Sequence, residues 1–310
     1  MKALITGSQG YIARNLAKKL SKNKIICYGI GRGNWKKKAD FEKWGYYQNI
    51  SGTINKQSLR KFKNKKFDYI IHLAGGSSPT ASIIDSISNK KDFEKNVLST
   101  RLILEHIRLK DNKAKFILMS TIAVVGNNKS NKIREDFKVN PISNYAKNKV
   151  EAEKLCFKYN KEFKIDTLII RGSSIYGPGM NKQIIHDVCL KITEGKNIFF
   201  GTGEEERDFI YIDDICSFVR KIIQRSFRGY KIINIGIGKG TKIKKIINYL
   251  SYRLGKKIKP KFNKVGFDVN PRKLIPDIKK AKKLKWKPKV TLYQGLNLYL
   301  KWFSKNQQND

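Results

Sequence analysis

A glycine-containing turn directly after the first apolar run constrains the fold of this 310-residue chain more than any other feature. The apolar residues 3–5 are followed by TGSQGYIA, residues 6–13, and then by an amphipathic stretch. Gly7 and Gly10 let the backbone turn tightly and approach a pyrophosphate, whose charge the amides and dipole of a following helix would stabilise. The small Ala13 permits close packing of that helix against the strand. This order predicts a dinucleotide-binding site near the N-terminus.

Short apolar runs alternate with amphipathic stretches through the first half of the chain. This alternation is typical of parallel strands joined by crossover helices, and it predicts an α/β fold with a doubly wound parallel (Rossmann) sheet. The expected strands are residues 2–6, 24–30, 69–73, 116–120 and 165–171, and the expected helices are residues 11–21, 93–108 and 144–162.

The regular alternation of apolar runs and amphipathic stretches ends after residue 171, and prolines interrupt the Lys-rich C-terminal stretch. We therefore expect two domains. Residues 1–171 would form the dinucleotide-binding domain, to which residues 205–237 return. Residues 172–204 and 238–310 would form a smaller C-terminal α/β domain that binds the substrate.

The chain carries 66 Lys and Arg residues against 25 Asp and Glu residues, a formal net charge of +41. One explanation is a polyanionic partner such as nucleic acid or an anionic membrane surface. The other is that Lys fills ordinary surface positions. The basic runs, such as residues 36–38, 63–66 and 279–287, are scattered, and few aromatic residues interleave with them, which favours the second explanation. Under either one, a positive field would attract an anionic substrate.

The four cysteines form no C-x-x-C pair, and together with the three histidines they offer no metal-ligand spacing. We expect reduced thiols and a cytoplasmic protein. Because the first expected strand begins at once, we expect no signal peptide. No apolar run approaches the about 20 residues that a helix needs to span a bilayer.

A Tyr and a Lys four residues apart, in YAKNK at residues 145–149, place a phenol and an ammonium on one helix face. A free phenol, with a pKa of about 10, is a poor base at neutral pH. The Lys149 ammonium would stabilise the phenolate of Tyr145 and lower its pKa, which suits general acid–base catalysis. Together with the glycine turn, these residues indicate hydride transfer to a nicotinamide cofactor.

The end of the second expected strand bears on the choice between NAD and NADP. An acidic residue there would bind the ribose 2′-hydroxyl of NAD. Gly31 stands at that position, and the next residue, Arg32, could pair with the 2′-phosphate of NADP. NADP is therefore slightly favoured. The alternative is that Arg32 faces solvent and that NAD binds without the acid.

Eight segments along nearly the whole chain resemble, in the same order, motifs of the extended short-chain dehydrogenase/reductase family, in its NAD-dependent nucleotide-sugar epimerase/dehydratase group. Several ordered matches are more specific than any single one. The segments are TGSQGYIA (6–13), FDYIIHLAG (67–75), NVLST (96–100), MSTIAVVG (119–126), YAKNK (145–149), RGSSIYGPG (171–179), ERDFIYIDDI (206–215) and DIKKAKKLKWKPKV (277–290).

The resemblance implies NAD or NADP as cofactor, a nucleotide-diphosphate sugar as substrate, no metal and a homodimer, with surface polysaccharide synthesis as the common setting. It implies Thr121, Tyr145 and Lys149 as catalytic residues. The implied cofactor-binding residues are Gly7, Gln9, Gly10, Tyr11, Ile12, Arg32, Leu73, Ala74, Gly75, Asn96, Tyr145 and Lys149, and the implied substrate-binding residues are Ser77, Thr121, Ser174, Arg207 and Arg272.

Two departures from the family pattern narrow the reaction. Relatives that dehydrate a 4-keto sugar carry Asp-Glu directly after the hydroxyl residue, where this chain has Ile122 and Ala123. No acid–base pair is then available for elimination of water, which argues against a 4,6-dehydratase. Ser174 replaces a frequent Asn, which leaves the preferred sugar open.

The expected reaction is therefore epimerisation, by transient oxidation at C4 and return of the hydride to the other face of the sugar. The alternative is an NADPH-dependent 4-keto-sugar reductase, which Arg32 would suit. An RNA-binding protein on the same fold is the alternative from another class. The intact set of Thr121, Tyr145 and Lys149 argues against it, so nucleic acid is an unlikely partner.

Overall fold

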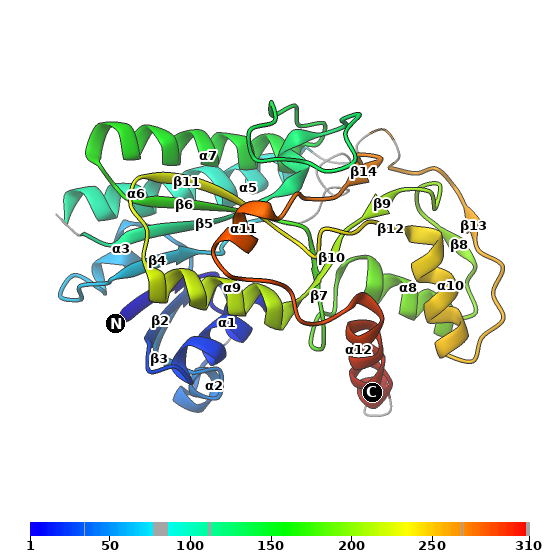
Figure 1. Cartoon of the computed structure of the whole chain (residues 1–310). Helices are drawn as coiled ribbons and strands as arrows, with labels where there is room; N and C mark the ends of the chain where they lie inside the picture. The colour runs from blue at the N-terminus through cyan, green and yellow to red at the C-terminus, as the bar shows by residue number, and fades with distance from the viewer. Residues whose placement is uncertain (34, 77–85, 111–112, 267, 269, 308–310) are drawn as a thin grey trace. The chain divides into compact units, whose positions relative to one another are not determined.

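The main sheet has seven strands, which come from residues between 2 and 235. Figure 1 shows the computed structural model. The structure describes residues 1–33, 35–76, 86–110, 113–266, 268 and 270–307. The strand order is β11-β6-β5-β4-β1-β2-β3, and the pairs from β3 to β5 are parallel. The strands are β1 (Lys2–Thr6), β2 (Ile26–Gly31), β3 (Tyr46–Ser51), β4 (Tyr69–His72), β5 (Lys115–Thr121), β6 (Thr167–Gly172) and β11 (Tyr230–Ile235).

The strand order reverses between β1 and β4, so the carboxyl ends of these two strands form the topological switch point at which such sheets bind ligands. Helices cover both faces of the sheet (Figure 1). This arrangement confirms the predicted doubly wound α/β fold. The helices of this part are α1 (Tyr11–Ser21), α2 (Lys38–Glu42), α3 (Lys56–Arg60), α5 (Ser86–Phe93), the π-helix η1 (Glu94–Leu98), α6 (Ser99–Leu109), the 3₁₀-helix η2 (Ile122–Val125), α7 (Asn144–Phe163) and α9 (Ile212–Arg225).

Two of these helices show how the sequence positions the site. Helix α1 buries Ala13, Leu16, Ala17 and Leu20, whose spacing of three to four residues makes one apolar face. Helix α7 begins after Ser143, whose hydroxyl accepts a hydrogen bond from the Ala146 amide at 3.2 Å. This cap satisfies one of the free amides of the first turn and so fixes where α7 starts.

The chain divides into two compact units, and the boundaries differ from those that the sequence suggested. The first unit contains residues Met1–Val124, Ser143–Arg171 and Cys216–Ile233, and the second contains Val125–Ile142, Gly172–Ile215 and Asn234–Asp310. The sequence had placed residues 125–142, 205–215 and 234–237 with the first domain.

Three small sheets and four helices make up the described regular structure of the second unit. The sheets pair β10 with β7, β9 with both β12 and β14, and β13 with β8. The elements are β7 (Ser174–Tyr176), α8 (Gln183–Thr193), β8 (Ile198–Phe199), β9 (Glu206–Arg207), β10 (Phe209–Tyr211), β12 (Thr241–Lys242), α10 (Ile243–Arg253), β13 (Lys261–Phe262), β14 (Lys273–Leu274), α11 (Lys279–Lys283) and α12 (Leu292–Gln307).

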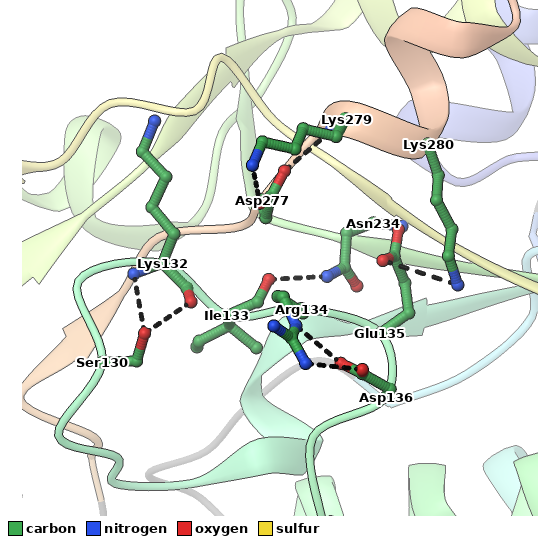
Figure 2. Close-up of polar contacts among 10 residues, drawn as sticks. All are labelled: Ser130, Lys132, Ile133, Arg134, Glu135, Asp136, Asn234, Asp277, Lys279 and Lys280. Atoms are coloured by element: carbon green, nitrogen blue, oxygen red, sulfur yellow. Dashed lines mark hydrogen bonds and ion pairs between the residues drawn. The ribbon is translucent and has the colours of Figure 1, made fainter.

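Hydrogen bonds with distant residues explain why residues 125–142 belong to the second unit (Figure 2). The Ile133 amide donates to the Ile275 carbonyl at 2.8 Å, and the Ile133 carbonyl accepts from the Asp277 amide at 2.7 Å. Asn234 adds a side-chain bond, from its Nδ2 to the same carbonyl at 2.8 Å. The Asn234 amide also donates to Glu135 at 3.0 Å. Such pairing over more than 90 residues leaves no periodic signal in the local sequence.

No helix in the described ranges combines the length and the apolar character that crossing a membrane requires.

Candidate active site

The predicted glycine turn joins β1 to α1 and packs against the segment that follows β4. Gly7 has a φ of +66°, and a Cβ at this position would lie 2.9 Å from the Ala74 backbone. The Gly10 amide donates to the Gly7 carbonyl at 2.7 Å and precedes the first residue of α1. Tyr11 and Ile12, both half-buried, form the first turn of that helix. The turn therefore needs glycine both for its left-handed backbone and for its close approach to Ala74.

Thr6 and His72, which the sequence analysis did not single out, hold the chain after β4 in place. The Thr6 hydroxyl accepts from the Leu73 and Ala74 amides at 3.2 and 3.1 Å and lies 2.7 Å from His72 Nδ1. Because the hydroxyl already accepts two bonds, we assign its proton to His72 Nδ1, so the ring proton sits on Nε2 and is donated to Ser99 Oγ at 3.1 Å. Burial lowers the pKa of His72 to about 3, which keeps the ring neutral.

A sequence signal for this network exists, because the two residues end neighbouring strands. Thr6 and His72 are direct partners in the register of β1 and β4. A hydroxyl and an imidazole at the carboxyl ends of adjacent parallel strands can meet only at the switch point. The network therefore orients the backbone of Leu73 and Ala74, which the sequence analysis assigned to the cofactor.

The end of β2 also packs against the glycine turn. A Cβ on Gly31 would lie 2.8 Å from the Ser8 amide nitrogen, so no acidic side chain fits at this position. The Arg32 side chain that follows is exposed. Ser8 Oγ donates to Asn49 Oδ1 at 2.6 Å, which leaves the Asn49 Nδ2 donor buried and without a partner among the described atoms.

Buried polar atoms near the turn are available to a ligand. Besides Asn49 Nδ2, the buried Gln9 Nε2 and Asn96 Oδ1 have no hydrogen-bond partner within the described part of the chain. Asn96 Oδ1 and Lys149 Nζ both lie close to Gly75, because a Cβ there would be 2.6 and 3.1 Å from these atoms. Buried polar atoms are normally paired, so these three mark positions where a bound molecule could complete the hydrogen bonding.

The three residues predicted to be catalytic lie together in the first unit. Thr121 ends β5, Tyr145 lies in the first turn of α7 and Lys149 lies one turn later. A side-chain hydrogen bond links Thr121 to Tyr145. Lys149 Nζ lies 5.9 Å from the centre of the Tyr145 ring and donates to the Met119 carbonyl at 3.0 Å. The phenol, hydroxyl and ammonium that the sequence predicted to act together are thus neighbours.

The ionisation of Tyr145 differs from the sequence prediction. We expected Lys149 to lower the pKa of Tyr145, but burial raises it to about 12; the Asp92 carboxylate adds to the rise, and the hydrogen bond from Thr121 opposes it. Burial also lowers the pKa of Lys149 to about 8. The pKa of Tyr145 is raised because desolvation disfavours the charged phenolate, as it disfavours the ammonium of Lys149. That Lys149 and the oxidised nicotinamide together lower the pKa of Tyr145 stays a prediction.

The predicted substrate residues that the structure describes, apart from Thr121, belong to the second unit, and Ser77 lies outside the described residues. Arg207 donates from Nη1 to the Arg272 carbonyl at 3.4 Å, and burial lowers the pKa of Arg207 to about 10. The Arg272 side chain is exposed. Ser174 is half-buried in β7, and its amide donates to the Asp208 carbonyl at 3.0 Å. The two arginines are therefore brought together, whereas Ser174 lies on a separate strand pair.

A cavity of about 490 Å³ within the second unit contains none of the predicted site residues. Four lysines and the β9 residue Glu206 contribute to its walls. The cavity is therefore not part of the proposed active site. The lysines are Lys239, Lys242, Lys245 and Lys289.

Comparison with known proteins places these features in a family. The model of the NAD dependent epimerase/dehydratase family matches residues 3–236. A UDP-glucuronate 4-epimerase of Thermodesulfobacterium geofontis is 31% identical over 98% of this chain and 96% of its own length. A dTDP-D-glucose 4,6-dehydratase of Dictyostelium discoideum is 33% identical over 80% of this chain and 62% of its own length.

A solved structure is also similar to this chain. The UDP-glucuronic acid 4-epimerase of Bacillus cereus, in complex with UDP-glucuronic acid and NAD, superposes with a TM-score of 0.89 at 28% identity, covering 99% of this chain and all of that one. Both the family model and this superposition extend over the glycine turn and over Thr121, Tyr145 and Lys149. The chain belongs to the NAD dependent epimerase/dehydratase family.

Proposed function

We propose that this protein is a nicotinamide-dependent nucleotide-sugar 4-epimerase in which Tyr145 is the acid–base residue. The observation that carries the proposal is the contact of Tyr145 with Thr121 and Lys149 in the unit that also contains the glycine turn. Relatives named as UDP-sugar 4-epimerases support the reaction type. UDP-glucose and UDP-glucuronate are the substrates to test first, because the names of similar proteins contain them.

The residues of the first unit fit a nicotinamide dinucleotide. Gly7, Gly10 and the amides at the start of α1 would hold the pyrophosphate, and no acidic residue in the first turn of α1 opposes it. The unpaired Asn49 Nδ2 and Asn96 Oδ1 would each gain a hydrogen-bond partner. When bound, the oxidised nicotinamide accepts a hydride and carries a positive charge.

The chemistry assigned to the chain is a proton transfer at the C4 hydroxyl of the sugar. Tyr145, as phenolate, takes the hydroxyl proton while the C4 hydride leaves, and it returns the proton when the hydride comes back to the other face. Thr121 holds the reacting oxygen. Because burial keeps the pKa of Tyr145 high, the phenolate needs the positive charges of Lys149 and of the oxidised ring together. Such general acid–base catalysis contributes about 10²–10⁴-fold.

The second unit is proposed to bind the substrate. Arg207 and Arg272 would hold the diphosphate, because guanidinium groups donate paired hydrogen bonds to phosphate oxygens. The partial burial of Arg207 would strengthen its attraction for an anion. Ser174 and Ser77 are assigned to the sugar by resemblance alone.

A nucleotide 4-keto-sugar reductase is the second candidate, and Arg32 favours it. Its exposed guanidinium could pair with the 2′-phosphate of NADPH. We expect Arg32→Ala to weaken binding of NADP at least about tenfold, the loss of one charge-assisted contact, and binding of NAD much less. Titration calorimetry with both nucleotides measures this. The exposed Lys36→Ala is the control, and equal losses for both nucleotides in Arg32→Ala would show that Arg32 does not bind the 2′-phosphate.

Mass spectrometry of the small molecules released on denaturation separates the two reactions. An epimerase reuses one cofactor molecule, so we expect about one NAD or NADP per chain in freshly purified protein. A chain that is purified without nucleotide and is then stabilised against heat by NADPH would instead support the reductase.

A further inference from the structure

Asp92, at the end of α5, carries a buried carboxylate that has no role in the proposed reaction. The residue is 8% exposed. It acts electrostatically on both Tyr145 and Lys149. Buried carboxylates are costly unless a neighbouring group compensates them, so this position calls for an explanation.

Gly76 provides the space that the carboxylate occupies. A Cβ on Gly76 would lie 2.2 Å from Asp92 Oδ1 and 2.8 Å from its Cγ. Gly76 has no left-handed backbone that would demand glycine. The contact that a side chain at this position would meet first is therefore the Asp92 carboxylate, and the chain conformation does not demand glycine.

Gly75 provides the neighbouring space in the same way. A Cβ on Gly75 would approach Asn96 Oδ1 and Lys149 Nζ, at 2.6 and 3.1 Å. Two consecutive glycines thus allow Asp92, Asn96 and Lys149 to converge on one stretch of backbone. The Asp92 carboxylate therefore belongs to the same cluster as Lys149, which we propose to be catalytic.

The π-helix η1 connects the two polar residues of this cluster. It begins two residues after Asp92 and contains Asn96, whose Nδ2 donates to the Asp92 carbonyl at 2.8 Å. Single π-turns inside helices are frequent at functional sites. Here the turn lies between α5 and α6, and both Asp92 and Asn96 approach the two glycines.

We propose that Asp92 is a positioning residue for the Tyr145–Lys149 pair: its carboxylate, seated in the space at Gly76, supplies a fixed negative charge that keeps Lys149 an ammonium at the reaction centre. This inference rests on the proposed function.

The charges around Lys149 support this role. Burial lowers the pKa of Lys149, and Glu153, Cys156 and Asp92 raise it. Glu153 has the largest opposing effect, but it is ion-paired with Arg171 at 2.7 Å and accepts a bond from Ser120 Oγ at 2.5 Å. Much of its charge is therefore compensated within the pair.

Two neighbouring ammonium groups oppose the effect of burial on Asp92. Burial raises the pKa of Asp92, and Lys95, on the next turn, and Lys149 lower it. The same carboxylate raises the pKa of Tyr145. Removing this charge should thus lower the pKa values of Lys149 and Tyr145 together.

The test compares the pH profiles of kcat/KM for the wild type, Asp92→Asn and Glu94→Gln. Glu94 is an exposed carboxylate two residues away and serves as the matched control. We expect both limbs of the Asp92→Asn profile to move to lower pH by more than about half a unit, as loss of a nearby charge predicts, and the control profile to stay in place. A purely structural role would lower activity without moving either limb.

A second measurement tests the placement without using activity. Gly76→Ala should lower the thermal unfolding midpoint, because its methyl group meets the Asp92 carboxylate, and adding Asp92→Ala should restore most of the loss. An unmoved pH profile for Asp92→Asn, or a Gly76→Ala loss that Asp92→Ala does not relieve, overturns the inference. If Tyr145→Phe retains turnover, the proposed function fails instead, so the two failures are distinguishable.

Discussion

Thr6 and His72 orient the backbone of the proposed cofactor site without adding a charge to it. The neutral ring follows from its surroundings, since His72 Nδ1 faces the Thr6 hydroxyl and Nε2 faces Ser99. The sequence places both residues at or near the carboxyl ends of expected strands, and the register of β1 and β4 shows that they are direct partners.

Stability should therefore depend on pH through His72. The pKa of His72 is about 3 in the folded chain, below the ordinary 6.5. Between these values the unfolded chain binds a proton that the folded chain does not, so the free energy of unfolding falls as the pH falls from 6.5 towards 3. The slope from this group is at most about 1.4 kcal/mol per pH unit.

Urea unfolding at several pH values between 7 and about 4 measures this slope. His72→Gln, which cannot take up the proton, should show a shallower fall than the wild type. An identical slope in the two proteins would mean that His72 is not a buried neutral ring.

Alanine substitutions at Gly7 and Gly195 distinguish the free-energy cost of backbone strain from that of a steric clash. Both have positive φ, +66° and +72°, but a Cβ on Gly195 would meet nothing within 4 Å. Gly195→Ala should cost about 1–2 kcal/mol, the strain alone. Gly7→Ala should cost more, because its methyl group also meets the Ala74 backbone, and it should abolish cofactor binding. Thermal unfolding and nucleotide titration check this, and equal costs would contradict the close approach.

At the scale of elements, the sequence predicted five of the seven strands of the main sheet and missed β3 and β11. Strand β3 was missed because in YYQNIS only Tyr46 and Ile50 are buried, with three polar residues and the exposed Tyr47 among them. The sequence also predicted one helix over residues 93–108, where the structure has the end of α5, the π-helix η1 and α6. The π-helix spans a single short segment between two α-helices, and the sequence analysis did not distinguish it from them.

The segment between Thr121 and Tyr145 offers an element-scale prediction. Glu135 is buried, accepts from the Asn234 amide and lies 3.6 Å from Lys280, whereas its neighbour Asp136 pairs with Arg134 in solvent. Figure 2 shows both pairs. Glu135→Ala should lower the free energy of unfolding by about 1–3 kcal/mol, since it leaves a buried amide unpaired.

Asp136→Ala is the matched control, and it should change the free energy of unfolding by less than about 0.5 kcal/mol because exposed ion pairs contribute little. Chemical unfolding of the two variants measures the difference. Similar small effects would contradict the anchoring of residues 125–142 by Glu135.

At the scale of the whole molecule, the ordered motifs predicted the fold, and the structure places Thr121, Tyr145 and Lys149 near one another. The effect of burial on the Tyr145 pKa was not predicted, because burial depth is a property of the folded chain that residue spacing does not reveal. The same limit hid Asp92, whose neighbours Gly76 and Lys149 are distant in sequence. What the sequence could not supply was therefore the electrostatic environment of the site.

The measurement that tests the central claim most directly is NMR of the sugar product formed by the wild type and by Tyr145→Phe, each incubated with the UDP-sugars proposed above. The wild type should produce the C4 epimer without net consumption of nicotinamide cofactor. Tyr145→Phe should produce at least about 10²-fold less while still binding the cofactor. Full turnover in Tyr145→Phe would contradict the account.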